Sequence, residues 1–241
     1  MSVDVILKFG GSAITIKDRL ETLKETELVH ACYIAHHLLQ QRKRIVVVHG
    51  AGSFGHHQAK KYGVNNGCEN LTMEEKSSVD KGFCLTRASV TKLNNLVVER
   101  LCLRGVLAVG VQSFGFWETD NGEVIKHNKD FISDIIDKGF VPVLHGDCVF
   151  DRTKGTKILS GDVIIKVLCN ELSVSDVVFL TDVNGIHNKD PREKDAVLIP
   201  HIAVDKDGVA ALNITTGMPD FDVTGGIDLK IKTAKDIVVT S

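Results

Sequence analysis

Short β-branched runs alternate along the chain with longer stretches of helical periodicity, and no other feature restricts the fold as strongly. Apolar residues recur at helical spacing in 19–44, 83–103, 129–138 and 161–172. The runs between them predict strands at Val3–Lys8, Ile45–His49, Leu107–Val111, Val141–Leu144 and Val177–Leu180. Strands that alternate with helices build βαβ units. The sequence therefore predicts an α/β protein, a three-layer α/β/α sandwich with a central, mostly parallel sheet.

The rest of the sequence gives no sign of a second domain. No Pro/Gly/Ser-rich linker, internal repeat or low-complexity segment interrupts it, so we expect a single domain over 1–241. Segments 64–82 and 113–126 are expected to form loops or hairpins. Hydrophobic residues make up 43% of the chain and aromatic residues only 5%, which suits a parallel sheet buried on both faces by aliphatic side chains.

Charge and hydropathy exclude two classes of partner. The formal net charge of -2 provides no basic footprint for nucleic acid. No apolar run approaches the ~20 residues of a membrane span, and the first residues lack a basic leader region. The 6 cysteines include no C-x-x-C pair and are expected to be buried thiols in a reducing compartment. We therefore expect a cytoplasmic protein without nucleic-acid or membrane partners.

The first expected strand ends in a lysine and two glycines, Lys8-Phe9-Gly10-Gly11, followed by Ser12. Ligands of open parallel sheets gather at the carboxyl ends of strands. Paired glycines let backbone N–H groups approach a phosphate, although a tight turn alone would also explain them. Lys8 lies in an otherwise apolar strand, so its ammonium needs an anionic partner if it is buried.

The second expected strand leads into a loop with Gly50, Gly52 and Gly55, which fit the dinucleotide fingerprint G-x-G-x-x-G. That fingerprint requires an acidic residue about 20 residues further on, at the end of a strand. Glu69 has the offset but lies in a segment without strand character, and another glycine turn precedes the loop. His56 could donate a hydrogen bond to a phosphate or act as acid or base. A surface histidine at a helix start is the alternative.

Two further turns place an aspartate after a glycine, "HGD" at 145–147 and "SGD" at 160–162. Asp162 could orient nearby lysines or hold Mg²⁺, or it could only favour the first turn of a helix through the helix dipole. The turn-rich segment 180–191 follows the last expected strand and is informative only together with the others.

These segments occur in one order over nearly the whole chain. They are "LKFGGSAITIK" (7–17), "VVHGAGSFGHHQAKKYG" (47–63), "GFVPVLHGD" (139–147), "ILSGD" (158–162), "FLTDVNGIHNKDP" (179–191) and "DVTGGIDLK" (222–230). Together they resemble the amino acid kinase superfamily and, within it, the isopentenyl phosphate kinases. The "GSFGH" element distinguishes that group from relatives that phosphorylate carboxylates or carbamate. The resemblance implies transfer of the γ-phosphate of ATP, with Mg²⁺, to isopentenyl phosphate.

The resemblance also implies roles for individual residues, with the acceptor site mainly in 1–150 and the nucleotide site mainly in 151–241. The implied catalytic residues are Lys8, Lys17, His56, Asp162 and Lys230. The implied acceptor-site residues are Ala51, Gly52, Ser53, Gly55, His56, Phe83, Ile158 and Gly161. The implied nucleotide-site residues are Lys8, Gly10, Gly11, Ser12, Lys17, Thr181, Asp182, Gly185, Lys189, Gly226 and Lys230. No residue is predicted to be a direct metal ligand.

In this assignment Lys8 and Lys230 neutralise the transferring phosphoryl group, and Asp162 orients them. A homodimer is also implied. Two alternatives stay open. One is another kinase of the superfamily, with a carboxylate or a nucleoside monophosphate as acceptor. The other is a catalytically silent nucleotide-binding module, because the chain is shorter after Lys230 than is usual in the family.

Overall fold

A computed structural model of the protein describes residues 2–188, 193–204, 210 and 211. The chain separates into two compact units, 1–180 and 181–241, and each is described by itself. The expectation of a single domain stays a prediction. No helix within the described residues combines the length and apolar character needed to cross a membrane.

The central sheet of the first unit has the strand order β3-β6-β2-β1-β9. The strands are β1 (Ser2–Phe9), β2 (Ile45–His49), β3 (Ala108–Gly110), β6 (Val141–His145) and β9 (Ser173–Leu180). Every pairing within this sheet is parallel. The predicted α/β fold with a parallel sheet is therefore confirmed.

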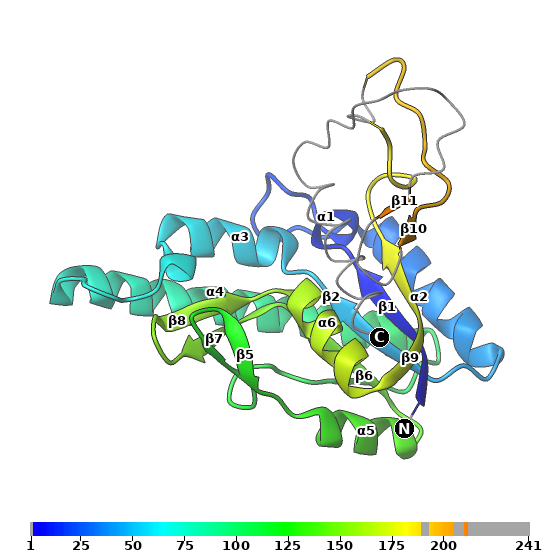
Figure 1. The fold of residues 1–241 in the computed structure, drawn as a ribbon, viewed down its shortest axis with the longest axis horizontal. Helices are drawn as coiled ribbons and strands as arrows, with labels where there is room; N and C mark the ends of the chain where they lie inside the picture. Colours follow the sequence, from blue (N-terminus) through cyan, green and yellow to red (C-terminus); the bar gives the residue numbers. More distant parts are fainter. Residues whose placement is uncertain (1, 189–192, 205–209, 212–241) are drawn as a thin grey trace. The chain divides into compact units, whose positions relative to one another are not determined.

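Helices cover both faces of this sheet (Figure 1). They are α1 (Gly11–Ile14), α2 (Glu25–Gln40), α3 (Gly52–Lys61), α4 (Met73–Leu103), α5 (Lys129–Asp137) and α6 (Gly161–Glu171), with a 3-10 turn at Val64–Asn66. Leu7 and Val47 face the core cluster built with α2 and α4. Successive strand residues point to opposite faces, so Lys8 and its register partner Val48 face the other layer, where α6 packs on β2 and β9.

The first unit also contains a second sheet, which has the strand order β5-β4-β7-β8. Its strands are β4 (Glu118–Asp120), β5 (Glu123–Lys126), β7 (Asp147–Asp151) and β8 (Gly155–Leu159). Asp151 joins its two hairpins, because the carboxylate accepts from the N–H groups of Gly122 at 2.8 Å and Lys154 at 2.7 Å. The expectation of loops or hairpins in 113–126 is confirmed by the β4–β5 pairing.

The expectation of a loop or hairpin over 64–82 is wrong for its second half, because α4 already begins at Met73. The reason is a capping box: Thr72 Oγ1 accepts from Glu75 N, and the Glu75 carboxylate accepts from Thr72 N. This start signal outweighs the polar composition of the helix's first turns.

The second unit contains a short antiparallel pair, β10 (Ala203–Val204) with β11 (Ala210–Ala211). An isolated bridge joins His187 and Leu198 within the same unit.

Candidate active site

Two glycine loops meet at the carboxyl ends of β1 and β2, and they touch backbone to backbone. A Cβ atom on Gly11 would lie 2.5 Å from Gly52 N, and one on Gly50 would lie 2.7 Å from Gly11 N. No side chain of any size fits at either position. The glycines after β1 and β2 therefore allow one loop to pack on the other.

Gly52 has a left-handed backbone (φ 50°), and a Cβ atom there would overlap Thr15 Oγ1. That hydroxyl donates to Gly11 O at 2.7 Å and accepts from Ser53 N at 2.9 Å. Gly55 lies on α3, where a Cβ atom would overlap Ala51 and approach Val90 of α4. The glycine spacing that fits a dinucleotide fingerprint is thus explained by packing around Thr15 and α4.

Lys8 and Asp162 form an ion pair between β1 and the first turn of α6. Their side chains are 12% and 24% exposed, so the pair lies largely out of solvent. The expectation that Lys8 needs an anionic partner is confirmed. The side-chain cap of α6 comes from Ser160, whose Oγ accepts from Val163 N at 3.2 Å, so Asp162 is not needed for that cap. The carboxylate of Asp162 is therefore placed to hold Lys8.

Gly10, Ser12 and Gly161 are the predicted site residues next to this pair in the chain. Gly10 follows β1 directly, and its N–H donates to Leu180 O at 2.8 Å. Ser12 lies in α1, where its carbonyl accepts from Lys24 Nζ at 2.8 Å. Gly161 approaches β2 closely, because a Cβ atom there would lie 3.4 Å from His49 O. Gly10 and Gly161 thus lie with Lys8 and Asp162 at the carboxyl ends of β1 and β2.

His56 lies on the exposed side of α3, within its N-terminal half. Partial desolvation by the surrounding protein, together with the positive charge of Lys17 and the neighbouring His57, lowers the pKa of His56 below its ordinary value. A neutral imidazole at this position can donate a hydrogen bond to a phosphate oxygen. Lys17 itself is exposed in the turn after α1.

Ser53 is fully buried, and its polar atoms are engaged within the protein. Its N–H donates to Thr15 Oγ1, and its hydroxyl accepts from Thr22 N at 3.3 Å. Ala51 precedes α3, and its carbonyl accepts from Phe54 N at 3.1 Å. Phosphate contacts from Ala51 and Ser53 stay predictions.

Phe83 and Ile158, predicted to contact the acceptor's tail, belong to one apolar cluster. Its buried members are Ala59, Val64, Phe83 and Cys148, with Tyr62, Phe114 and Ile158 packed against them. The Phe83 ring stacks on Phe150 with 5.8 Å between centroids and meets Phe114 edge-on at 5.7 Å. Ala59 lies one helical turn after His56, so α3 links the glycine loops to this cluster.

Arg87 and Asp147 border the aromatic cluster, and sequence analysis assigned neither a role. Arg87 donates to both carboxylate oxygens of Asp147, at 3.0 and 3.1 Å, and its guanidinium lies 4.1 Å from the centre of the Phe114 ring. Asp147 stands in the quoted "HGD" motif, but Arg87 lies in a helical pattern that carries no signal of a partner. The pair fixes α4 to the start of β7.

His49 and His145 form a buried stack beneath the same edge, with ring centroids 5.4 Å apart. Each ring donates from Nδ1 to the carbonyl of the following glycine, Gly50 at 3.1 Å and Gly146 at 3.0 Å. Asn94 donates to His49 Nε2 at 3.1 Å. Burial, with a smaller contribution from the neighbouring His145, lowers the pKa of His49 to about 3. Both carbonyl contacts place a proton on Nδ1, and the bond that His49 Nε2 accepts from Asn94 leaves no proton on that nitrogen, so the His49 ring is neutral.

Other predicted nucleotide-site residues lie in the second unit. Thr181 Oγ1 donates to Asp182 Oδ1 at 3.2 Å and accepts from Val183 N at 3.5 Å. Gly185 has φ 142°, and a Cβ atom there would lie 2.7 Å from Leu198 Cδ1. Lys189, Gly226 and Lys230 lie outside the described residues.

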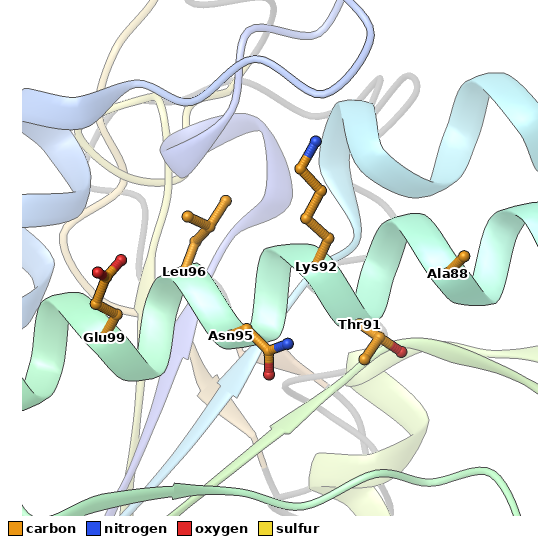
Figure 2. A pocket seen from close by; sticks show the side chains of 6 residues that line it. All are labelled: Ala88, Thr91, Lys92, Asn95, Leu96 and Glu99. Carbon is orange, nitrogen blue, oxygen red and sulfur yellow. The ribbon is translucent and has the colours of Figure 1, made fainter.

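A hollow of about 390 Å³ lies on α4 (Figure 2). It is lined by Ala88, Thr91, Lys92, Asn95, Leu96 and Glu99. None of these residues belongs to the glycine loops or the aromatic cluster, so this hollow is not the candidate site. Within the described part of the chain, no group of three or more His, Cys, Asp or Glu side chains is arranged to hold a metal ion.

Comparison with known proteins identifies the family. The model of the amino acid kinase family matches residues 5–241. The isopentenyl phosphate kinase of Arabidopsis thaliana is 38% identical, over 97% of this chain and 83% of its own. The chain belongs to the amino acid kinase family, in its isopentenyl phosphate kinase branch. The isopentenyl phosphate kinase of Methanocaldococcus jannaschii is 31% identical, over 94% of this chain and 84% of its own.

Solved structures agree with this membership. The crystal structure of the T. acidophilum isopentenyl phosphate kinase product complex superimposes with a TM-score of 0.78. The two chains are 26% identical, and the match covers 99% of this chain and 87% of the other. The chain is therefore a phosphotransferase of the amino acid kinase fold.

Proposed function

We infer that the chain transfers the γ-phosphoryl group of ATP to isopentenyl phosphate and forms isopentenyl diphosphate. The observation that carries this proposal is that α3 joins two unlike groups of residues. Its first turn contacts the loop after β1, His56 follows in the next turn, and Ala59 packs into the aromatic cluster around Phe83. An acceptor with an anionic head and a short apolar tail would match a site that lies between these two groups. The relatives named above are kinases of such a molecule.

Each predicted catalytic residue has a distinct task in this proposal. Lys8, oriented by Asp162, neutralises charge on the transferring phosphoryl group, together with Lys230. His56 donates a hydrogen bond to the acceptor phosphate and stabilises charge as transfer proceeds. Lys17 contacts the phosphates of ATP. The backbone N–H groups of the glycine loops complete the cradle.

The chemistry requires little beyond this arrangement. Phosphoryl transfer depends on holding two anions in line while their mutual repulsion is neutralised. The acceptor oxygen belongs to a phosphate that is already largely deprotonated near neutral pH, so no strong general base is needed. A site of lysines, glycines and one histidine can position and neutralise two phosphates in this way.

Magnesium, the homodimer and a cytoplasmic location are further parts of the proposal. Mg²⁺ usually keeps several waters and binds through substrate phosphates with one or two carboxylates. Such binding needs no cage of protein ligands, and the Asp162 carboxylate beside Lys8 is the described group that could contribute to it. The ion would supply charge neutralisation between the phosphates. Gel filtration with light scattering tests the dimer.

A coupled assay of ADP release tests the proposal. The acceptors are isopentenyl phosphate, N-acetylglutamate and UMP, each with ATP and MgCl₂. We expect turnover only with isopentenyl phosphate. Turnover with N-acetylglutamate or UMP alone would establish a different kinase of the family. ATP binding without turnover of any acceptor would establish a silent module.

A further inference from the structure

The turn between α1 and α2, residues 15–22, carries Lys17. An antiparallel bridge between Thr15 and Leu23 closes its base, and Ile16 N donates to Thr22 O at 2.9 Å. Lys17 lies at the exposed end of this turn, where a lysine side chain has many rotamers. Its reach toward a phosphate depends on where the backbone of the turn is held.

Helix α3 holds the turn at two places. Buried Ser53 bonds to Thr15 and Thr22 at the base, through its N–H and its hydroxyl. At the outer end, His57 donates from Nε2 to the carbonyl of Lys17 itself at 3.0 Å. His56 lies on the same turn of α3. The helix that carries His56, which is predicted to contact the acceptor, therefore also holds the backbone of Lys17, which is predicted to contact ATP.

Helix α4 holds the far side of the turn. Lys92 extends from α4 on the side away from Thr91 (Figure 2), and its ammonium pairs with the Glu21 carboxylate at 2.5 Å. Glu21 has a left-handed backbone (φ 50°), a conformation that is strained for a non-glycine residue and persists only when neighbours impose it. The turn is therefore constrained from both helices.

We propose that His57 is a positioning residue for Lys17: its bond to the Lys17 carbonyl fixes the lysine against the phosphates of ATP, at a set distance from His56. The proposal rests on the proposed function, which assigns Lys17 to ATP. Fixing the backbone before ligand binds lowers the ordering cost that binding would otherwise include.

Binding of AMP-PNP, measured by calorimetry in magnesium buffer, tests this role apart from turnover. The variants are His57→Ala, His57→Gln and, as a neighbouring control on α3, Gln58→Ala. We expect His57→Ala to weaken binding roughly two- to ten-fold, the range of one net hydrogen bond. Gln places an amide N–H near the position of Nε2, so His57→Gln should restore most of the affinity. Gln58→Ala should bind as wild type does.

The same substitution in a Lys17→Met background separates positioning from general damage. With no ammonium to position, His57→Ala should change the affinity by less than about two-fold. An equal loss in both backgrounds, or no loss in either, would overturn the proposal. Thermal melts identify variants that fail to fold, and for these His57→Gln serves as the test. Wild-type turnover of isopentenyl phosphate is measured separately, so a wrong acceptor refutes the proposed function without affecting the binding comparison.

Discussion

The buried pair His49 and His145 should make the stability of the protein fall as the pH drops below about 6.5. Burial lowers the pKa of His49 to about 3, so the folded protein keeps this ring neutral at pH 5. The unfolded chain takes up a proton there at its ordinary pKa. Stability from this group is therefore complete above pH 6.5 and is lost progressively between pH 6.5 and 3.

The magnitude follows from the unfolded state. Each pH unit below 6.5 costs about 1.4 kcal/mol per neutral buried histidine, so His49 alone removes about 2 kcal/mol between pH 7.5 and pH 5. This loss of stability does not depend on the exact pKa of His49 in the folded protein, as long as that pKa lies well below 5. Burial also lowers the pKa of His145, so it acts in the same direction.

The perturbation is His49→Asn, which removes the titrating ring and places an amide N–H near Nδ1, within reach of Gly50 O. Urea unfolding at pH 7.5 and pH 5 gives the stability of variant and wild type. We expect the variant to gain about 2 kcal/mol relative to wild type at the lower pH, whatever its loss of packing at pH 7.5. Asn94→Leu damages the same cluster without removing a histidine, so its stability difference from wild type should stay constant. A His49→Asn variant with the same stability difference at both pH values would refute the neutral buried ring.

Four further predictions concern single residues. His56→Ala should lower turnover of isopentenyl phosphate by about 100-fold with an unchanged thermal melt, and near-normal turnover would remove it from the mechanism. Asp162→Asn should lower turnover about ten-fold by releasing Lys8, read from kcat at saturating substrates. Gly52→Ala should cost at least about 2 kcal/mol in urea unfolding, because strain at φ 50° adds to overlap with Thr15. In Asp151, burial raises the pKa, but the donors from Lys154, Thr119 and the β4–β5 turn lower it to about 2. Asp151→Asn should therefore lower the free energy of unfolding by about 2 kcal/mol between pH 5 and 8, and by less below pH 4, as measured by urea unfolding. A loss of stability that becomes larger at acidic pH would contradict this prediction.

The sequence predicted the strands well because each is a compact β-branched run. It also predicted that Lys8 needs an anion, since a charge in an apolar strand is costly. Only the family resemblance assigned Asp162 to Lys8, because the two residues are 154 positions apart and residue patterns alone leave the role of Asp162 open. The start of α4 could have been predicted, since Thr72 and Glu75 have the spacing of a capping box.

His57 and Arg87 carry no such signal. Both make long-range contacts, His57 to the Lys17 carbonyl and Arg87 above all to Asp147, and neither spacing nor composition encodes such a pairing. A histidine next to His56 has the same local pattern whether it holds a backbone carbonyl or faces water. The role of such a residue can be recognised only in the folded chain, where α3 lies against the turn after α1 and α4 lies against the start of β7.

The glycines of the second loop illustrate how one local pattern can serve two purposes. In a dinucleotide site, G-x-G-x-x-G lets backbone approach a pyrophosphate and lets a helix pack on a strand. Here Gly50 and Gly52 admit the backbone of Gly11 and the hydroxyl of Thr15, and Gly55 admits α4. The requirement for close backbone approach is shared, but the approaching group is protein. The same packing brings the loop that follows β1 and Lys8 against the helix that bears His56, and the mechanism proposed above needs that juxtaposition.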